Sequence, residues 1–457
     1  MSDVPDAPGR ARGHGALDRF VARIDRLPVA RWIFLLGLLF TVFSGNSGLL
    51  GLPLGPERLL IPLAILLVLL DPGRPAIRWR FVHGVIAFLV FWTLLSMVGH
   101  GTLALPDARF AFLDRVLLPL VLFVCAPLLF PDVSARREFA RALTVLGGWL
   151  ALNTIFEMIG PEALVFPRYI LEAAEAETAT RRAAGPFLAS EALGMVLLLA
   201  GFAAMLTGWR DRGGWRRLGA VVGPLCFLSS ILTMTRSVWL GAGLAVLVAA
   251  TGTRQMRRTA LGAVAALIAA GAVVTATLPE LVEDVITRLS MSSSLYDRAN
   301  TNAAALRIVG ERPVEGIGWG RFILDGWQWV RQSPDYPLTN VGIEVHNVFL
   351  SRAAELGVPG ALAFALCVLA GPVWILVRTR RTEAREWWAF GAAAFAIWLV
   401  PSLSSPNPYP LPNDLFWVVS GILGTRLITW PREDDLASRQ QVPDPAPSHP
   451  VPPGQPV

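Results

Sequence analysis

Long apolar runs separated by short polar connections fill the chain between Trp32 and Trp430. About twelve of these runs approach the length that a helix needs to cross the roughly 30 Å hydrocarbon core of a membrane. They cover residues 32–53, 57–70, 81–99, 110–130, 141–160, 188–208, 218–234, 237–251, 260–278, 346–377, 388–404 and 412–430. The pattern predicts an all-α polytopic membrane protein with about twelve transmembrane helices.

Arginine clusters indicate which side of the membrane each connection occupies. Clusters precede the first apolar run and follow every even-numbered run up to the tenth, for example at residues 74–80, 210–217 and 378–385. Basic segments translocate poorly and collect in cytoplasmic loops. We therefore expect both ends of the chain to be cytoplasmic.

The polar segments divide the chain into three parts. Residues 1–31 are charged and lack the pattern of a cleaved signal, which predicts a basic cytoplasmic segment before a transmembrane domain over residues 32–430. Residues 431–457 are rich in proline and predict a disordered cytoplasmic tail. Two large outer-face loops are expected at 161–187 and, between the ninth and tenth spans, at 279–345. Apolar residues at helical spacing over 278–289 suggest a short helix on the membrane surface.

Composition agrees with solvation by lipid. Hydrophobic residues make up 54% of the chain and charged residues 16%, and the mean hydropathy is +0.52, whereas soluble proteins carry about a quarter charged residues. The net charge of +6 and pI near 10.0 do not indicate nucleic-acid binding, because the basic residues lie in short clusters between apolar runs.

Every basic residue other than histidine is arginine, and lysine does not occur. This excludes chemistry that needs an amine, including Walker A ATP hydrolysis and Schiff-base formation. The three cysteines each lie inside an apolar run without CxxC spacing, so neither a zinc site nor a disulfide framework is expected.

Arg236 lies where the topology rule gives an arginine no reason to be. It sits in Thr-Met-Thr-Arg-Ser-Val-Trp (residues 233–239), which is nearly the whole connection between two spans on the outer face. A guanidinium at that depth costs several kcal/mol unless a carboxylate or phosphate answers it. The alternative is that it snorkels to the lipid headgroups or pairs with an outer carboxylate.

His346 opens the tenth span in Glu-Val-His-Asn-Val-Phe-Leu (residues 344–350). An imidazole titrates near neutral pH and suits a general base for a hydroxyl nucleophile. Asn347 beside it can orient groups or cap the helix. The alternative is that this His-Asn pair only caps the span.

Further polar and aromatic residues of the outer face are candidates for substrate contacts. Four aromatic residues of the long loop can stack on sugars, or can be ordinary interfacial aromatics: Trp319, Trp327, Trp329 and Tyr336. Glu191 can answer one of the arginines. Glu355 is expected to pair with Arg352, three residues earlier on the same helix face.

Several short motifs, in matching order and spacing, resemble the O-antigen ligase and O-antigen polymerase superfamily of bacterial membrane glycosyltransferases. They are Arg-Ala-Ala-Gly-Pro-Phe at 182–187, Thr-Arg-Ser with a following tryptophan at 235–239, Asp-Arg at 297–298, Arg-Pro-Val-Glu-Gly-Ile-Gly-Trp-Gly-Arg-Phe at 312–322, and His-Asn-Val-Phe-Leu with Glu-Leu-Gly-Val-Pro-Gly at 346–360. The resemblance covers almost the whole membrane region.

The resemblance implies three catalytic residues: Arg236 and Arg298 match the family's essential arginines, and His346 its essential histidine. Arg182 matches a further arginine and would bind substrate. The implied reaction is metal-independent, inverting transfer of a glycan from undecaprenyl diphosphate to an acceptor hydroxyl on a glycan, lipid or protein. It needs no cofactor and serves lipopolysaccharide or exopolysaccharide synthesis in the cell envelope.

Two questions stay open at this point. A transporter or flippase of lipid-linked glycans would share the spans and a cationic cavity, although ion-coupled carriers usually place ionisable groups near the bilayer midplane, where these spans carry almost none. Within the enzyme class, the motifs do not separate a ligase from a polymerase.

Overall fold

A computed structural model describes residues 26–176, 182–251, 253–254, 256–258, 261–262, 265, 293–331 and 343–430. These residues form helices and the connections between them. The described part of the chain contains no β-strand, and an isolated bridge joins Ile77 to Thr429. The first helices along the chain are α2 (Arg26–Phe40), α3 (Glu57–Leu69), α4 (Phe81–Gly99), α5 (Pro106–Phe112), α6 (Leu118–Leu129), α7 (Val133–Ile159) and α8 (Tyr169–Ala176).

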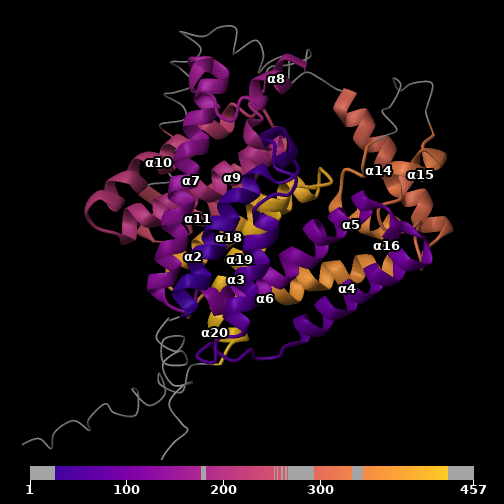
Figure 1. The fold of residues 1–457 in the computed structure, drawn as a ribbon, viewed down its shortest axis with the longest axis horizontal. Coiled ribbons are helices and arrows are strands. Elements are labelled where there is room, and N and C mark those ends of the chain that lie inside the picture. Colours follow the sequence, from indigo (N-terminus) through magenta and orange to yellow (C-terminus); the bar gives the residue numbers. More distant parts are fainter. Residues whose placement is uncertain are drawn as a thin grey trace, which may run out of the picture.

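The remaining described helices run from α9 to α20 (Figure 1). They are α9 (Ser190–Arg210), α10 (Gly213–Ile231), α11 (Arg236–Ala250), α14 (Ser293–Glu311), α15 (Phe322–Asp325), α16 (Val348–Val368), α17 (Trp374–Thr379), α18 (Arg385–Ser402), α19 (Pro410–Leu423) and α20 (Thr425–Ile428). A π turn at Leu113–Leu117 joins α5 to α6, and another at Leu369–Val373 joins α16 to α17.

The structure confirms the predicted class: the described elements are helices, and several of them are suited to a membrane. Among the described residues, five continuous helices are long and apolar enough to cross a membrane: α4, α5 with α6, α7, α9, and α16 with α17. Two shorter apolar helices cover Pro28–Phe43 and Arg236–Ala250. The count of twelve spans and their orientation stay predictions, and most of the ninth run and the surface helix expected at 278–289 lie outside the described residues.

The first apolar run is not one continuous helix. Helix α2 ends at Phe40, and two short 3₁₀ turns, Thr41–Phe43 and Ser47–Leu50, follow it. Gly45 (φ +86°) and Gly51 (φ +73°) adopt the left-handed backbone conformation that favours glycine. The helical part of the run is therefore shorter than residues 32–53, and it packs against α3.

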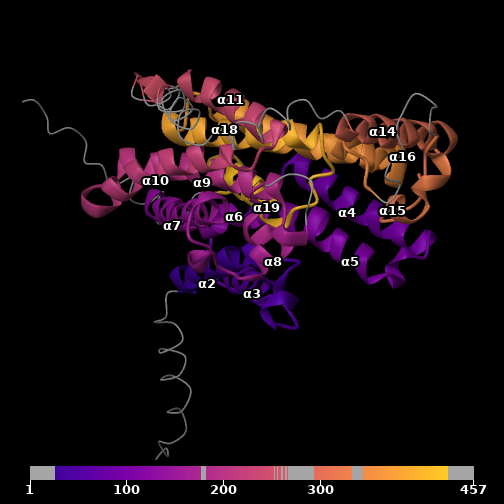
Figure 2. The ribbon, with the colours of Figure 1, turned by 90° about the horizontal axis from the view of Figure 1, so that it is seen from above.

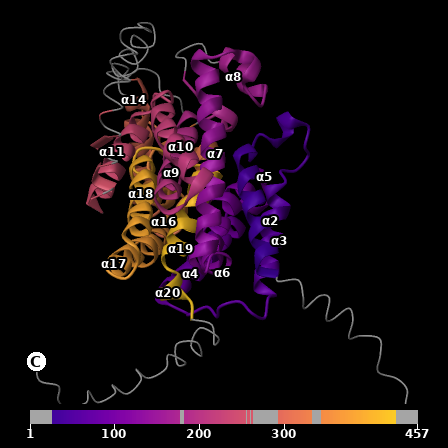
Figure 3. The same ribbon diagram turned by 90° about the vertical axis from the view of Figure 1, so that its left-hand side faces the viewer.

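The bundle is layered around α9. Figure 2 shows α9, α6 and α19 between a layer with α11 and α18 and a layer with α2 and α3. Helix α9 packs on α7, α10 and α18, and most of its side chains are buried. Figure 3 shows α8 and α14 at one end of the bundle and α17 and α20 at the other.

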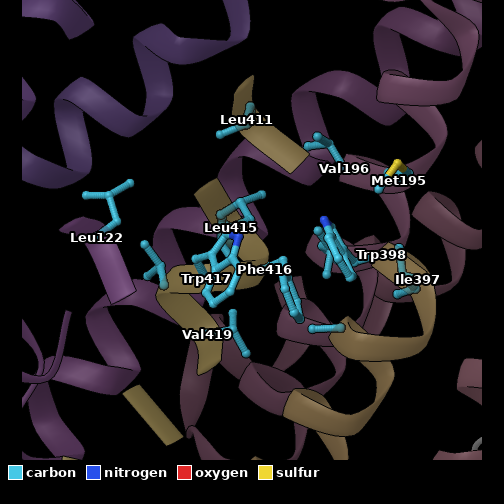
Figure 4. Packing of buried hydrophobic residues seen from close by; sticks show 14 of the residues in the cluster. Leu122, Met195, Val196, Ile397, Trp398, Leu411, Leu415, Phe416, Trp417 and Val419 are labelled. Carbon is cyan, nitrogen blue, oxygen red and sulfur yellow. The ribbon is translucent and has the colours of Figure 1, made fainter. Parts of the chain in front are cut away.

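Large aromatic side chains fill the centre of this core. The rings of Trp398 (α18) and Phe416 (α19) stack with centroids 4.4 Å apart and an angle of 9° between planes. Figure 4 shows Met195 and Val196 of α9 beside them. The indole nitrogen of Trp398 donates to Asn413 Oδ1 over 2.8 Å, so this buried polar group is satisfied. The stacked rings therefore pack α18 against α19, the next helix along the chain.

Candidate functional site

The N-terminal ends of three helices meet at one end of the bundle. Ser237, the second residue of α11, donates to Glu191, the second residue of α9, and Asn347, which caps α16, donates to Leu403 O after α18. Each helix N-terminus carries a partial positive charge from its unpaired backbone N–H groups. The sequence places three of its candidate residues within or next to these first turns: Glu191, Arg236 and His346.

His346 lies next to Arg298 of α14. It is partly buried, and its Nδ1 makes no hydrogen bond with the described residues. Burial and the positive charge of Arg298 lower the pKa of His346. A hydrogen bond with the backbone of Glu344 and the negative charges of Asp297 and Glu344 raise this pKa, but by less. A lowered pKa favours the neutral imidazole near pH 7, which is the form that can accept a proton.

Glu191 faces the same place from α9. Its Oε1 accepts a 2.8 Å hydrogen bond from Ser237 Oγ, and it also interacts with the hydroxyl of Ser405 and electrostatically with Arg298. Arg298 is the arginine that acts on Glu191, and the expected role of Glu191 in answering it stays a prediction. Helices α9 and α11 approach each other closely at Gly194. A Cβ at this position would lie only 2.7 Å from the side chain of Val238.

The loop between α18 and α19 contacts Glu191 through the hydroxyl of Ser405. Asn407, in a left-handed conformation at φ +43°, donates from its backbone to Ser405 Oγ over 3.0 Å and from its side chain to Ser402 Oγ over 2.9 Å. Asn413 donates to the carbonyls of Asn407 and Tyr409, each over 2.9 Å. This network connects the polar loop to the aromatic core beneath it.

The segment that carries Arg182 is fixed by backbone hydrogen bonds. The buried Glu157 of α7 accepts from Ala184 N (2.8 Å) and Gly185 N (3.1 Å), and Ala183 N donates to Leu232 O at the end of α10. The bonds hold Arg182 near Tyr409, with which it interacts electrostatically.

Arg236 is the first residue of α11 and is partly buried. Its neighbour Ser237 holds Glu191, which places Arg236 at the edge of the same cluster. The structure thus places the predicted Arg298 within electrostatic reach of both His346 and Glu191, and Arg236 precedes Ser237, the partner of Glu191, at the edge of this cluster.

Asn347 has the capping role that the sequence left as an alternative. Its side chain accepts from Leu350 N over 3.0 Å, and its amide nitrogen donates to Leu403 O over 3.3 Å. The cap starts α16 directly after His346 and links it to the loop that follows α18.

Trp319 differs from its predicted role in sugar stacking. It is only 1% exposed, its indole nitrogen donates to Ala108 O over 3.0 Å, and the Arg352 guanidinium lies 4.6 Å from its ring centroid. The ring is enclosed by packing and is not available to a sugar in this structure. Trp327, by contrast, is 57% exposed, while Trp329 binds Glu311 Oε2 and Tyr336 lies outside the described residues.

Glu355 has more partners than the expected Arg352. The two side chains form an ion pair at 4.0 Å, as predicted. In addition, Glu355 Oε1 accepts from the backbone N–H groups of Gly320 (3.0 Å) and Phe322 (3.3 Å). Glu355 therefore binds the glycine-rich loop at 312–322, and its pairing with Arg352 is the longest of these contacts.

Two further parts of the cluster were not predicted. Arg115 forms a 2.7 Å ion pair with Glu344, two residues before His346. Tyr409 interacts electrostatically with Glu191 and Glu344. Burial has the largest effect on the Tyr409 hydroxyl, and both burial and the two negative charges raise its pKa. The signals were present: Asp114 and Arg115 interrupt an apolar run, and Tyr409 lies in a proline-rich connection with several hydrogen-bonding residues.

The described residues contain no group of three or more histidine, cysteine, aspartate or glutamate side chains that could hold a metal ion. The helical membrane architecture defines the class: an integral membrane protein, in which His346, Arg298 and Glu191 lie near one another at one end of the bundle.

A comparison with family models makes the assignment specific. Residues 220–365 match the family described as O-Antigen ligase, and this stretch contains Arg236, Arg298 and His346. This match supports the resemblance of the region to O-antigen ligases and, together with the apolar helices, a glycosyltransferase-like membrane role in polysaccharide synthesis. No curated protein matches the sequence.

Proposed function

We propose that the protein transfers a glycan from an undecaprenyl-diphosphate carrier to an acceptor hydroxyl on the outer face of the bacterial cytoplasmic membrane. The observation that carries the proposal is that Arg298 interacts electrostatically with both Glu191 and His346, at a point where three helix N-termini meet. A diphosphate bears the charge that arginines and helix N-termini attract.

The reaction is a single displacement at the anomeric carbon of the donor. The acceptor oxygen forms the new C–O bond while the bond from that carbon to the diphosphate oxygen breaks, and the lipid diphosphate leaves with the electron pair. His346 accepts the proton of the acceptor hydroxyl. Its pKa, lowered by burial and by Arg298, keeps it in the neutral form that a base requires.

The arginines stabilise charge as it develops on the leaving group. Arg298 and Arg236 lie on different helices, so they can approach a diphosphate from two directions, and Arg182 on its fixed segment offers a third. Guanidinium groups bind phosphate oxygens in a bidentate manner. Glu191 holds Ser237 beside Arg236 and attracts Arg298, which orients both cations toward one centre.

Gene deletion followed by sizing of the accumulated lipid-linked glycans tests the proposal. Single repeats on the outer leaflet indicate a polymerase, and long unattached chains indicate a ligase. Glycans trapped on the cytoplasmic leaflet would instead identify a flippase and contradict the proposed transferase.

Substitution of Arg236 by lysine tests the role of the guanidinium. We expect transfer to fall by about 100-fold, since an ammonium cannot reproduce a bidentate contact. Arg109 is exposed on α5, and Arg109→Lys is the matched control that keeps wild-type turnover. Full turnover in Arg236→Lys would mean that charge alone suffices.

A further inference from the structure

The glycine-rich loop, residues 312–322, and the kink of α16 form one hydrogen-bonded unit. Helix α16 opens at Gly357, whose backbone is left-handed at φ +69°. The opening releases the carbonyls of Ala354 and Glu355, which accept from Ile317 N and Gly318 N over 3.0 Å each. In return, Val358 N donates to Pro313 O over 2.7 Å.

Glycine is required where the two chains approach. A Cβ at Gly316 (φ +66°) would lie 2.6 Å from the Ala354 and Glu355 oxygens, and one at Gly357 would overlap Val314 O. The Gly-x-Gly-x-Gly and Glu-Leu-Gly-Val-Pro-Gly motifs are therefore the two halves of a single contact.

The Glu355 carboxylate closes this unit with a side chain. It is 7% exposed, and its bonds to Gly320 N and Phe322 N hold the end of the loop. Its partner Arg352 is 4% exposed and lies over Trp319, whose backbone N–H donates to Ser96 Oγ of α4. A buried carboxylate needs such donors, because leaving it without them costs several kcal/mol.

The same loop carries α14. Buried side chains of α14, the loop and the start of α16 form one small cluster: Ala304, Ala305, Ile308, Ile317, Phe322, Val345 and Ala354. Arg298 lies 13 residues before the end of α14 at Glu311, or about 20 Å at 1.5 Å per residue. A tilt of about 5° at the loop would therefore move Arg298 by about 2 Å.

We propose that Glu355 is a positioning residue that sets the distance between Arg298 on α14 and His346 at the start of α16. The inference rests on the proposed transferase function, and it adds a residue that does not touch substrate. A misplacement of about 1 Å at a reacting centre can cost about 100-fold in rate, so the loop contact has a direct consequence for turnover.

The test combines activity with a distance that does not depend on activity. Spin labels at Ala299→Cys on α14 and Leu362→Cys on α16 report the separation of the two helices, since both positions are exposed and the three native cysteines are buried. In Glu355→Ala we expect a broadened or shifted distance distribution and a turnover about 10- to 100-fold lower, with the KM for acceptor nearly unchanged.

Two variants separate positioning from general damage. Glu355→Gln keeps an oxygen that accepts from Gly320 N, so it should recover most of the turnover and a narrow distance distribution. Glu315→Gln changes an exposed carboxylate of the same loop and should match the wild type. If Glu355→Ala fails to fold, Glu355→Asp tests the same contact, because it keeps the charge and shortens the side chain by one methylene.

The pH dependence of turnover gives an independent readout. The groups that face His346 are Arg298 and Asp297 from α14 and Glu344 from its own segment, and Arg298 contributes more than Asp297. If α14 moves away in Glu355→Ala, the pKa of His346 rises and the acidic limb of the profile moves to higher pH.

An unchanged distance distribution in Glu355→Ala would overturn the inference, and so would a changed distribution with wild-type turnover. If the wild type itself shows no transfer, the proposed function fails, while the distance measurement still decides whether Glu355 sets the position of α14.

Discussion

The two sides of the candidate site are held in different ways. Glu191 and Ser237 lie on α9 and α11, which are packed into the apolar core, and the α18–α19 loop beneath them continues into the Trp398–Phe416 stack. Arg298, by contrast, lies on α14, whose buried contacts form a small separate cluster with the glycine-rich loop and the start of α16. His346 lies where the two sides meet.

The difference indicates a division of work. Apolar packing over many residues gives the first side its stability, because each buried side chain contributes separately. The second side depends on a few backbone hydrogen bonds and one carboxylate, so a single change can shift it. Variants in the apolar packing of the first side should mainly affect stability, and variants on the second side should mainly affect turnover.

The largest expected effect is on the residue that joins both sides. His346→Ala should lower transfer by about 10²- to 10⁴-fold, because it removes the general base. The protein should still be monodisperse after extraction and should keep its thermal stability, since His346 is not part of the buried core. Transfer at more than half the wild-type rate would remove the general-base role.

The next effect is on the stability of the first side. Phe416→Ala should lower the free energy of unfolding by about 3–5 kcal/mol, since Phe416 is fully buried against Trp398. Leu240→Ala on α11 is the matched control, because Leu240 is 67% exposed. Thermal unfolding in detergent measures the stability of both variants. Equal midpoints would mean that the stack does not stabilise this side of the site.

On the second side, Arg298→Lys should lower turnover by about 100-fold without a change in stability. The control is Arg307→Lys on the same helix, where Nε donates to Trp329 O over 2.8 Å, away from His346. Wild-type turnover in Arg298→Lys together with a loss in Arg307→Lys would show that the wrong arginine has been assigned.

A smaller effect is expected at the helix cap. Asn347→Ala removes the hydrogen bond to Leu350 N and should cost about 1 kcal/mol of stability. Asn347→Asp keeps an acceptor for Leu350 N and is the control. If Asn347→Ala leaves stability unchanged but raises the KM, the side chain acts on substrate and not as a cap.

The smallest effect is a shift along the pH axis. The pKa of His346 is lowered from its ordinary value near 6.5 by burial and by Arg298, and the base is active when neutral. Turnover should therefore be retained down to below pH 6.5 and fall as the pH drops through the lowered pKa. A profile of turnover against pH measures this, and an acidic limb above pH 6.5 would contradict the burial of His346.

The candidate residues of the site could be named from the sequence, because their chemistry is tied to residue type and topology. An arginine between two spans, a histidine before a span and the motif order single out Arg236, Arg298 and His346 without coordinates, and their catalytic roles stay predictions. The support of these residues was not predictable. Glu157, Tyr409, Ser405 and the Arg115–Glu344 pair come from segments far apart in the chain, and nothing in their local sequence specifies the partner.

Trp319 illustrates the limit of residue type as a guide. An aromatic residue in an outer loop suits sugar stacking, yet this one fills a space between Ala108, Ser96 and Arg352, which belong to three other parts of the chain. Whether an aromatic ring is enclosed or open depends on its neighbours in space, which the local pattern does not contain.

The sequence by itself determined the helical membrane class, because apolar runs of this length leave a backbone in lipid no other way to satisfy its hydrogen bonds. It also determined which residue types can bind a diphosphate and accept a proton. Only the tertiary structure decided that the two glycine motifs form one contact, and that Glu355 holds the loop beside Arg352. Those contacts depend on which surfaces of distant helices pack together, and that is set by the whole core and not by any one segment.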